Sequence, residues 1–240
     1  MDFSRMQGLF SPARLEKIQS SFVAVFGLGG VGGYALEALA RSGVGKFYLV
    51  DGDVICQSNV NRQILALSST IGKSKVEVAE RRVKEINENA QIITCYKMIR
   101  AEQSEDTKDL SLNLPILDEL DAIVDATDDV SLKVALAYEA EKRGVLIISS
   151  GGTGNRLDCD SFKIEDIYKT SGCPLCRVLR HRLKLLKVSA LPVLYAKDGQ
   201  MAKTDEAGVR QNRKENVISS CAWAPAIAGL KMAEYVIMNL

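Results

Sequence analysis

The segment SFVAVFGLGGVGG, residues Ser21–Gly33, joins an apolar run to a glycine-rich turn. Its run Phe22–Phe26 contains β-branched valines and stops abruptly at glycine, as a short buried strand does. The residues Tyr34–Ala40 that follow are rich in alanine and leucine at helical spacing. The segment therefore predicts a strand, a tight turn and a helix, in that order.

The glycines of this turn match the pattern G-x-G-x-x-G at Gly27, Gly29 and Gly32. Such glycines permit the turn, let the backbone approach a phosphate and let the helix pack close to the strand. A phosphate would then lie at a helix N-terminus, where free N–H groups favour negative charge. A second apolar run, Phe47–Val50, ends in Asp51, whose carboxylate suits ribose hydroxyls. A purely structural glycine turn is the alternative, but the placement of Asp51 favours a nucleotide site.

Length and composition narrow the class of protein. The 240 residues suffice for one large α/β domain, and 31 basic against 30 acidic residues give a net charge of +1. A net charge this close to zero argues against binding of nucleic acid over the whole surface, so any surface for a polyanion must be local. No apolar stretch is long enough to span a bilayer, the first residues lack a secretory pattern, and the six scattered cysteines suit a reducing compartment. We therefore expect a soluble cytoplasmic protein without a membrane partner.

Further apolar runs alternate with helical segments along the chain, at Gln91–Tyr96, Ala122–Val124 and Val145–Ser149. This alternation predicts an α/β fold with a Rossmann-like, largely parallel sheet and helices on both faces. Phe162–Ile167 and Pro192–Ala196 break the rhythm, and we expect them to extend the sheet on its C-terminal side as antiparallel strands. We expect a single domain over residues 1–240, comprising an N-terminal arm at 1–20, a nucleotide-binding part at 21–157 and a substrate-binding extension at 158–240.

Polar residues fill the loop after Asp51, where a dinucleotide dehydrogenase would run directly into its next helix. Arg62 offers a planar fork of donors for phosphate oxygens, and Asn59 and Gln63 supply neutral donors beside it. Lys75 falls in the first turn of the next predicted helix, where a cation opposes the helix dipole. An anion-binding lysine explains that position better than a solvated one.

The segment DATDD places Asp125, Asp128 and Asp129 at the carboxyl end of a predicted strand, where open parallel sheets bind ligands. One of these carboxylates can hold a divalent metal whose other ligands include phosphate oxygens, as magnesium prefers. Alternatively, Asp128 or Asp129 caps the following helix without any ligand. The two roles can coexist in one loop.

Cations cluster in the segment CPLCRVLRHRLKLLK, at Arg177, Arg180, Arg182, Lys184 and Lys187. Apolar residues alternate with them at helical spacing, which predicts a basic amphipathic helix. In a neutral chain such a cluster points to a phosphate backbone or an acidic partner, although a solvated helix face is the simpler alternative. The chain's one histidine, His181, lies in this helix, which argues against Ser-His-Asp and Cys-His catalysis.

One C-x-x-C is present, formed by Cys173 and Cys176, and the later Cys221 has no cysteine three residues away. A zinc tetrad needs two such pairs, so the pattern argues against zinc. A redox pair at a helix start and two ordinary thiols both remain open.

Five motifs, GLGGVGG, DGD, SNVNRQ, GKSK and DATDD, follow one another between Gly27 and Asp129. With them the chain resembles the adenylating enzymes related to ubiquitin-activating enzymes and to the activators of thiamin and molybdopterin biosynthesis. The resemblance implies that Arg62, Lys75 and Asp128 serve catalysis, with magnesium on Asp128. It adds Arg5, supplied across a homodimer to the partner's ATP, unless Arg14 takes that place. The implied ATP site comprises Gly27, Gly29, Gly30, Gly32, Asp51, Asp53, Asn59, Arg62, Gln63, Lys75 and Asp128.

Within this family the chain is similar to the bacterial branch that dehydrates threonylcarbamoyladenosine in tRNA. The shared features are SSGGTG at Ser149–Gly154, DIYKT at Asp166–Thr170 and the Pro174-Leu175 pair before the basic helix. Cys173 and Cys176 depart from that branch. The resemblance implies that ATP activates the threonyl carboxylate of modified adenosine 37, that the side group closes into a ring with release of AMP, and that the basic helix holds the tRNA.

Three other functions stay open. The chain could activate the C-terminal carboxylate of a ubiquitin-like or sulfur-carrier protein, with that protein as its partner. It could be a dinucleotide-dependent oxidoreductase that uses the same glycine turn, although Arg62, Lys75 and the aspartates argue against it. It could also sense a nucleotide without catalysis.

Overall fold

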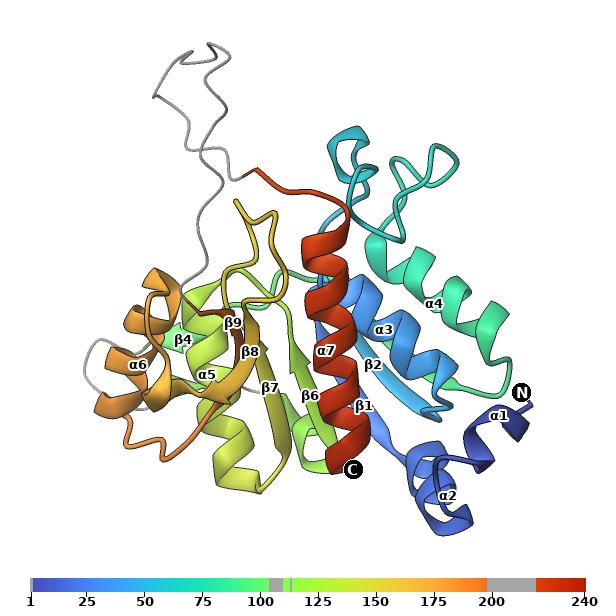
Figure 1. Ribbon diagram of the computed structural model, residues 1–240, viewed down its shortest axis with the longest axis horizontal. Coiled ribbons are helices and arrows are strands. Elements are labelled where there is room, and N and C mark those ends of the chain that lie inside the picture. Colours follow the sequence, from blue (N-terminus) through green and yellow to red (C-terminus); the bar gives the residue numbers. More distant parts are fainter. Residues whose placement is uncertain (1, 104–109, 113, 198–218) are drawn as a thin grey trace.

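A seven-stranded sheet forms the centre of the molecule, in the order β3-β2-β1-β6-β7-β9-β8 (Figure 1). The computed structural model describes residues 2–103, 110–112, 114–197 and 219–240. The strands of the sheet are β1 (Phe22–Phe26), β2 (Lys46–Val50), β3 (Gln91–Cys95), β6 (Ala122–Asp125), β7 (Leu146–Ser150), β8 (Phe162–Asp166) and β9 (Pro192–Ala196). A separate antiparallel pair consists of β4 (Glu102–Gln103) and β5 (Leu110–Ser111).

Neighbouring strands of the large sheet run parallel, except for β8 and β9. The prediction of a Rossmann-like, largely parallel sheet is therefore confirmed. One detail of it is wrong, because Pro192–Ala196 pairs in parallel with β7 and only Phe162–Asp166 runs antiparallel. The direction of β9 depends on its distant partner β7, which the residues of β9 themselves do not reveal.

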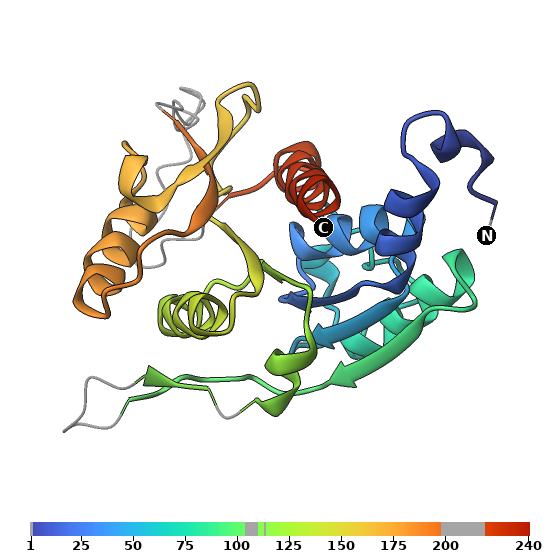
Figure 2. The same ribbon diagram turned by 90° about the horizontal axis from the view of Figure 1, so that it is seen from below.

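Helices cover both faces of the sheet (Figure 2). One face carries α2 (Pro12–Ser20), α3 (Gly32–Arg41), α4 (Lys75–Ile86) and α7 (Trp223–Asn239), and the other carries α5 (Val130–Arg143) and α6 (Pro174–Leu185). Side chains of β1 alternate between the two cores, since Val23 packs with the first set of helices and Ala24 with the second. No helix in the part of the chain that the structure describes could cross a membrane. The remaining helical segments are α1 (Ser4–Gln7), η1 (Gln57–Asn59), η2 (Pro115–Glu119) and η3 (Ile167–Lys169).

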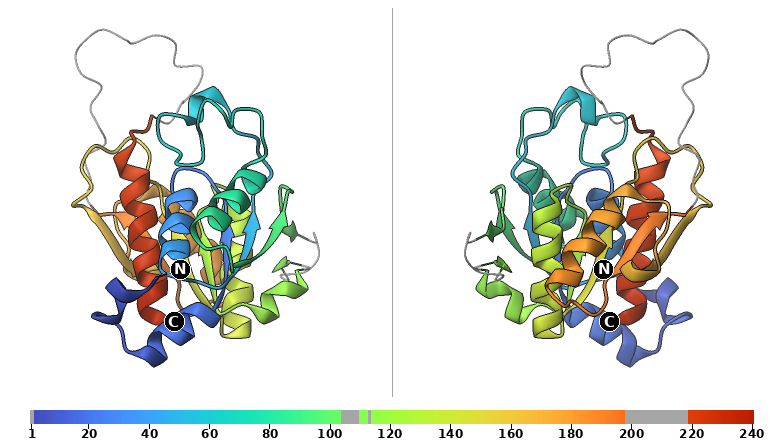
Figure 3. Two further views of the ribbon diagram at one scale, coloured as in Figure 1. Left: turned by 90° about the vertical axis from the view of Figure 1, so that its right-hand side faces the viewer. Right: turned by 90° about the vertical axis from the view of Figure 1, so that its left-hand side faces the viewer.

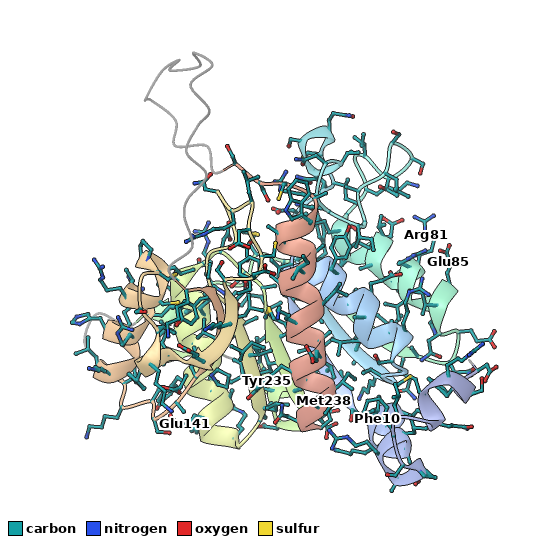
Figure 4. The ribbon with its side chains drawn as sticks, in the orientation of Figure 1. Phe10, Arg81, Glu85, Glu141, Tyr235 and Met238 are labelled. Carbon is teal, nitrogen blue, oxygen red and sulfur yellow. The ribbon has the colours of Figure 1, made fainter. Side chains whose placement is uncertain are left out.

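The N-terminal arm docks where α7 ends. Both termini lie at this end of the molecule in Figure 3, and Phe10 and Met238 are labelled there in Figure 4. Ser11 caps α2 by accepting a hydrogen bond from the Arg14 N–H, and Phe10 packs against the adjoining core. The Arg14 guanidinium donates from Nη2 to the carbonyl oxygen of Ile237 at 2.7 Å. A cation at the carboxyl end of a helix is favourable, so Arg14 has a structural role within its own chain.

Two glycines allow the turn after β1 to approach other backbone closely. Gly27 has a φ of +85°, and a Cβ there would lie 2.7 Å from the carbonyl oxygen of Ala126. A Cβ on Gly32 would lie 1.7 Å from the carbonyl oxygen of Gly27. Because no other residue fits at either position, the turn is held directly against the segment that follows β6.

A fully buried lysine holds the end of β6 in place. Lys133 of α5 lies with its Nζ 3.1 Å from both carboxylate oxygens of Asp125 and 3.3 Å from Ser149 Oγ. Ser149 Oγ donates to Asp125 Oδ2 at 2.6 Å, and Thr127 Oγ1 donates to Asp125 Oδ1 at 2.8 Å. Asp125 therefore points into the protein, and its bonds fix the backbone that leads to Asp128.

Replacing this lysine should be costly. We expect Lys133→Met to lower the free energy of unfolding by about 3–5 kcal/mol, because it leaves the Asp125 carboxylate buried without its cation. Urea unfolding measures the change. Lys142→Met, at an exposed position of the same helix, should stay within about 0.5 kcal/mol of the unmodified protein. Equal stability of the two variants would contradict this assignment.

Candidate active site

A cavity of about 730 Å³ lies at the carboxyl ends of β1, β2 and β6. The strand order changes direction at β1, which is where open α/β sheets bind ligands. The volume falls in the range of sites for small molecules and cofactors. Its lining residues are Gly27, Gly29, Val50, Asp51, Gly52, Asp53, Asn59, Arg62, Gln63, Lys75, Lys97, Met98, Ile99, Arg100, Ala126, Thr127, Asp128, Asp129 and Leu132.

Most of the residues that the sequence singles out meet in this cavity. Those that line it are Gly27, Gly29, Asp51, Asp53, Asn59, Arg62, Gln63, Lys75 and Asp128. Gly30 and Gly32 are not among the lining residues. A Cβ on Gly30 would lie 3.0 Å from the side chain of Pro225, so this glycine lets α7 pack against the turn.

The carboxylate of Asp51 links the glycine turn, the loop after β2 and the start of α4. Its Oδ2 accepts the Leu28 N–H of the glycine turn at 2.7 Å, and its Oδ1 accepts the Asp53 N–H at 2.8 Å. The Nζ of Lys75 lies 3.6 Å from Asp51 Oδ2 and 2.6 Å from Asp53 Oδ2. Lys75 is the first residue of α4, after the cap Ser74, so its ammonium is buried at a helix N-terminus between two carboxylates.

Donors from the loop 57–63 line the next part of the cavity. Arg62 Nη1 donates to the Ser58 carbonyl oxygen at 2.6 Å and to Asn61 Oδ1 at 2.9 Å, which fixes the guanidinium at the rim. Gln63 is 9% exposed, and its Oε1 has no hydrogen-bond partner among the residues that the structure describes. A buried acceptor without a donor is unfavourable unless a ligand supplies one, so Gln63 indicates a ligand with a hydrogen-bond donor in this cavity.

The structure separates the two aspartates at the start of α5. Asp129 is the helix cap, since its Oδ1 accepts the Leu132 N–H at 2.9 Å. Asp128 is exposed to the cavity instead. No group of three metal-ligating side chains occurs in the described parts of the chain. A magnesium ion at Asp128 would therefore need ligand oxygens and water, which is the coordination that this ion accepts.

Residues 97–100 are part of the cavity wall that sequence reasoning missed. Lys97 and Arg100 add two cations, and Met98 and Ile99 add apolar surface, all directly after β3. A Cβ on Gly52 would lie 2.5 Å from Met98 Cγ, so this segment lies close against the loop after β2. The signal was available, because β3 is parallel to β2 and ends at the same edge of the sheet.

Arg5 does not line the cavity of its own chain. It lies in α1, exposed, whereas the loops at 57–73 lie at the opposite end of the sheet (Figures 1 and 3). Within one chain the structure therefore does not bring Arg5 to the other predicted site residues.

The basic cluster on α6 divides into two groups. Arg180 Nη1 donates to the Thr170 carbonyl oxygen at 2.7 Å and to Thr170 Oγ1 at 2.8 Å, and Arg182 Nη1 donates to Ser131 Oγ at 3.0 Å. These two arginines fasten the helix to the protein. The exposed cations of the cluster are Arg177, Lys184 and Lys187. The predicted helix is too long at its end, because α6 stops at Leu185 and Lys187 lies beyond it with a φ of +59°.

The C-x-x-C lies at the start of α6, away from the cavity lining. Cys173 caps the helix, with its Sγ 3.5 Å from the Cys176 N. The Cys176 thiol, with the backbone N–H groups of Cys176, Gly152 and Leu175, lowers the pKa of Cys173 to about 5 against the effect of burial. The same pairing, together with burial, raises the pKa of Cys176. Cys221 belongs to another neighbourhood, since its Sγ donates to the Arg156 carbonyl oxygen at 3.4 Å.

Variants of the two adjacent aspartates should behave differently. We expect Asp129→Ala to lower the free energy of unfolding by about 1 kcal/mol through loss of the helix cap. Asp128→Ala should change it by less than about 0.5 kcal/mol, because that side chain is exposed. Instead, Asp128→Ala should weaken nucleoside triphosphate binding in the presence of magnesium and not in its absence. Urea unfolding measures the free energy of unfolding of both variants, and calorimetric titration measures their nucleotide affinity. A larger loss of stability for Asp128→Ala than for Asp129→Ala would show that Asp128 is the helix cap.

Known proteins resemble this chain over most of its length. The model of the ThiF family matches residues 3–238. The chain is 36% identical over 248 residues to tRNA threonylcarbamoyladenosine dehydratase of Bacillus subtilis, covering 99% of this chain and 94% of that protein. The Haemophilus influenzae protein of the same name is 35% identical over 182 residues, which are 76% of this chain and 67% of that protein. The crystal structure of E. coli tRNA N6-threonylcarbamoyladenosine dehydratase in complex with ATP has a TM-score of 0.79 and 25% identity, covering 99% and 92% of the two chains. The protein is thus a member of the ThiF family.

Proposed function

We propose that this protein is an ATP-dependent enzyme that dehydrates threonylcarbamoyladenosine in tRNA by adenylating its carboxylate. The observation that carries the proposal is the convergence of Arg62, Lys75, Gln63 and Asp128 on a glycine turn in one cavity. The relatives of Bacillus subtilis and Haemophilus influenzae bear the name of this activity, and the E. coli structure holds ATP.

The first step, adenylation of the carboxylate, depends on stabilisation of negative charge and needs no general base. A carboxylate is already ionised at neutral pH, so it can attack the α-phosphorus of ATP and displace pyrophosphate without prior proton transfer. The barrier lies in the charge that gathers on the phosphate oxygens. Arg62 and Lys75 are the cations set to meet that charge, and Lys97 and Arg100 also line the cavity. Asp51, whose carboxylate already orders the turn, would accept the ribose hydroxyls.

Asp128 is the residue that would hold a magnesium ion. Its exposed carboxylate suits an ion that takes one protein ligand and several phosphate and water oxygens. When bound, the ion would neutralise phosphate charge.

The second step needs no nucleophile from the protein. The activated carboxyl carbon is attacked by another atom of the same side group, a five-membered ring closes and AMP leaves. Well-oriented intramolecular attack reaches effective molarities of roughly 10⁵ M or more. The buried thiols of Cys173 and Cys176 therefore have no part in this chemistry.

The RNA would be held by the exposed face of α6, through Arg177 and Lys184, and by Lys187 just beyond the end of the helix. The Arg182–Ser131 hydrogen bond joins this helix to the start of α5, next to Asp128. We propose further that the enzyme works in the cytoplasm as a homodimer. In each chain, residues 1–240 would form a single domain. Arg5, remote from the cavity of its own chain, would complete the cavity of the partner.

The decisive assay uses ATP, magnesium and tRNA that carries threonylcarbamoyladenosine. We expect release of AMP that depends on the tRNA, with a nucleoside product lighter by one water. Arg62→Ala should lower kcat/KM by about 10²–10³-fold, because one donor to the developing charge is lost. An unchanged nucleoside mass under conditions where ATP binds would refute the proposal. Release of AMP that requires a small carrier protein instead of tRNA would establish the alternative of protein activation.

Salt dependence tests the RNA surface separately. We expect Lys184→Ala and Arg177→Ala to weaken tRNA binding equally for modified and unmodified tRNA. Each should reduce the slope of log affinity against log salt by about 1, as loss of one phosphate contact does. Lys142→Ala, an exposed lysine of α5, serves as the control. Unchanged slopes for both α6 variants would remove this helix from the RNA surface.

A further inference from the structure

Trp223 is the only tryptophan of the chain and is 50% exposed at the first position of α7. Its Nε1 donates to the carbonyl oxygen of Leu157 at 2.9 Å, so its polar edge is satisfied within the protein. The Leu157 side chain beside it is exposed as well. What Trp223 presents to solvent is therefore a fixed apolar ring, and core packing does not account for it.

Contacts with three segments hold the start of α7 beside residues that flank the cavity lining. Ser219 exchanges two hydrogen bonds with Asn155, at 2.7 and 2.9 Å. The Asn61 amide, next to Arg62, donates to the Ser220 carbonyl oxygen at 3.3 Å. Pro225, two residues after Trp223, packs on Gly30 of the glycine turn. The N-terminal end of α7 accordingly lies at the same end of the molecule as the loops at 57–73 (Figures 1 and 3).

We propose that Trp223 is a stacking platform for an unpaired nucleobase of the RNA substrate, beside the base whose side group enters the cavity. This inference rests on the proposed function. A base whose side group reaches into a protein cavity must leave the stack of its neighbours, and proteins cover such bases with aromatic rings. The start of α7, which carries Trp223, contacts Asn61 and Gly30, and each of these is the chain neighbour of a residue that lines the cavity.

RNA suits this surface better than another apolar protein face. Asn61, which donates to the Ser220 carbonyl oxygen, directly precedes Arg62 of the cavity lining, so a base stacked on Trp223 would lie beside the cavity that receives the modified base. Stacking is tolerant of sequence, so the platform would strengthen binding of single-stranded loops and contribute little to binding of duplex.

The single tryptophan provides a direct probe. The experiment titrates the full protein with an RNA hairpin whose loop contains adenosine or threonylcarbamoyladenosine, and with a fully paired duplex of equal length. We expect saturable quenching of tryptophan fluorescence by both hairpins and not by the duplex. No quenching by a hairpin that binds, as measured by anisotropy of labelled RNA, overturns the proposal. Fluorescence that changes with protein concentration in the absence of RNA also overturns it, because a second copy would then cover the ring.

Variants of Trp223 measure how much its ring contributes to RNA affinity. Trp223→Ala should weaken hairpin binding by roughly 5- to 150-fold, the range that loss of one base–aromatic stack gives. Trp223→Tyr should retain affinity within about threefold, and Trp223→Leu, apolar but not aromatic, should not. ATP affinity should be unchanged. Tyr96→Ala removes a similarly exposed aromatic residue at the end of β3 and should leave RNA affinity unchanged.

The outcomes separate this inference from the function on which it rests. With cyclisation as the readout, Trp223→Ala should raise KM for tRNA and leave kcat and the KM for ATP unchanged. Cyclisation by the unmodified protein with no effect of Trp223→Ala would leave the function standing and overturn the platform. Quenching by hairpin RNA without any cyclisation would support the platform and refute the dehydratase assignment.

Discussion

The carboxylate of Asp51 connects three segments that are distant in the sequence. It accepts N–H groups from Leu28 in the glycine turn and from Asp53 in its own loop, and it faces the Lys75 ammonium at the start of α4. A single side chain thereby sets the spacing between the phosphate-binding turn and a cation. Without it, the glycine turn would keep its local shape but lose its position relative to α4.

Charge within the site is arranged in two layers. Below the cavity, Lys133 balances Asp125 in a fully buried pair, and that pair holds the segment that carries Asp128. In the cavity itself, Lys75 is already paired with Asp53, whereas Arg62, Lys97 and Arg100 line the walls. The lower layer supplies rigidity, and the upper layer supplies the positive charge that a polyphosphate requires.

The cations of α6 show a comparable division. Arg180 and Arg182 donate to Thr170 and Ser131 and so fasten the helix, while Lys184 and its exposed neighbours stay at the surface. A count of charges treats these cations as equivalent, but their different positions around the helix give them different partners. A proposed RNA surface formed by α6 at one side and Trp223 at another would place the reacting base between them.

The sequence by itself determined most of the strands and helices and which residues would meet in the cavity. Apolar runs, glycine spacing and helix signals depend on neighbours in the chain, and they predicted the strands and the glycine turn. The five motifs that resemble the adenylating enzymes predicted that Asn59, Arg62, Lys75 and Asp128 share one site, and all four line the cavity. Only the tertiary structure decided that Asp129 is the cap, that Asp125 is buried against Lys133, that residues 97–100 form a wall and that β9 runs parallel to β7. The cap and the buried pair join residues three and eight positions apart, and only the packing of α5 on the sheet selects which side chains of the DATDD segment take these roles. The wall at residues 97–100 and the direction of β9 depend on partners far away in the chain, and long-range pairing leaves no periodic pattern in the residues on either side.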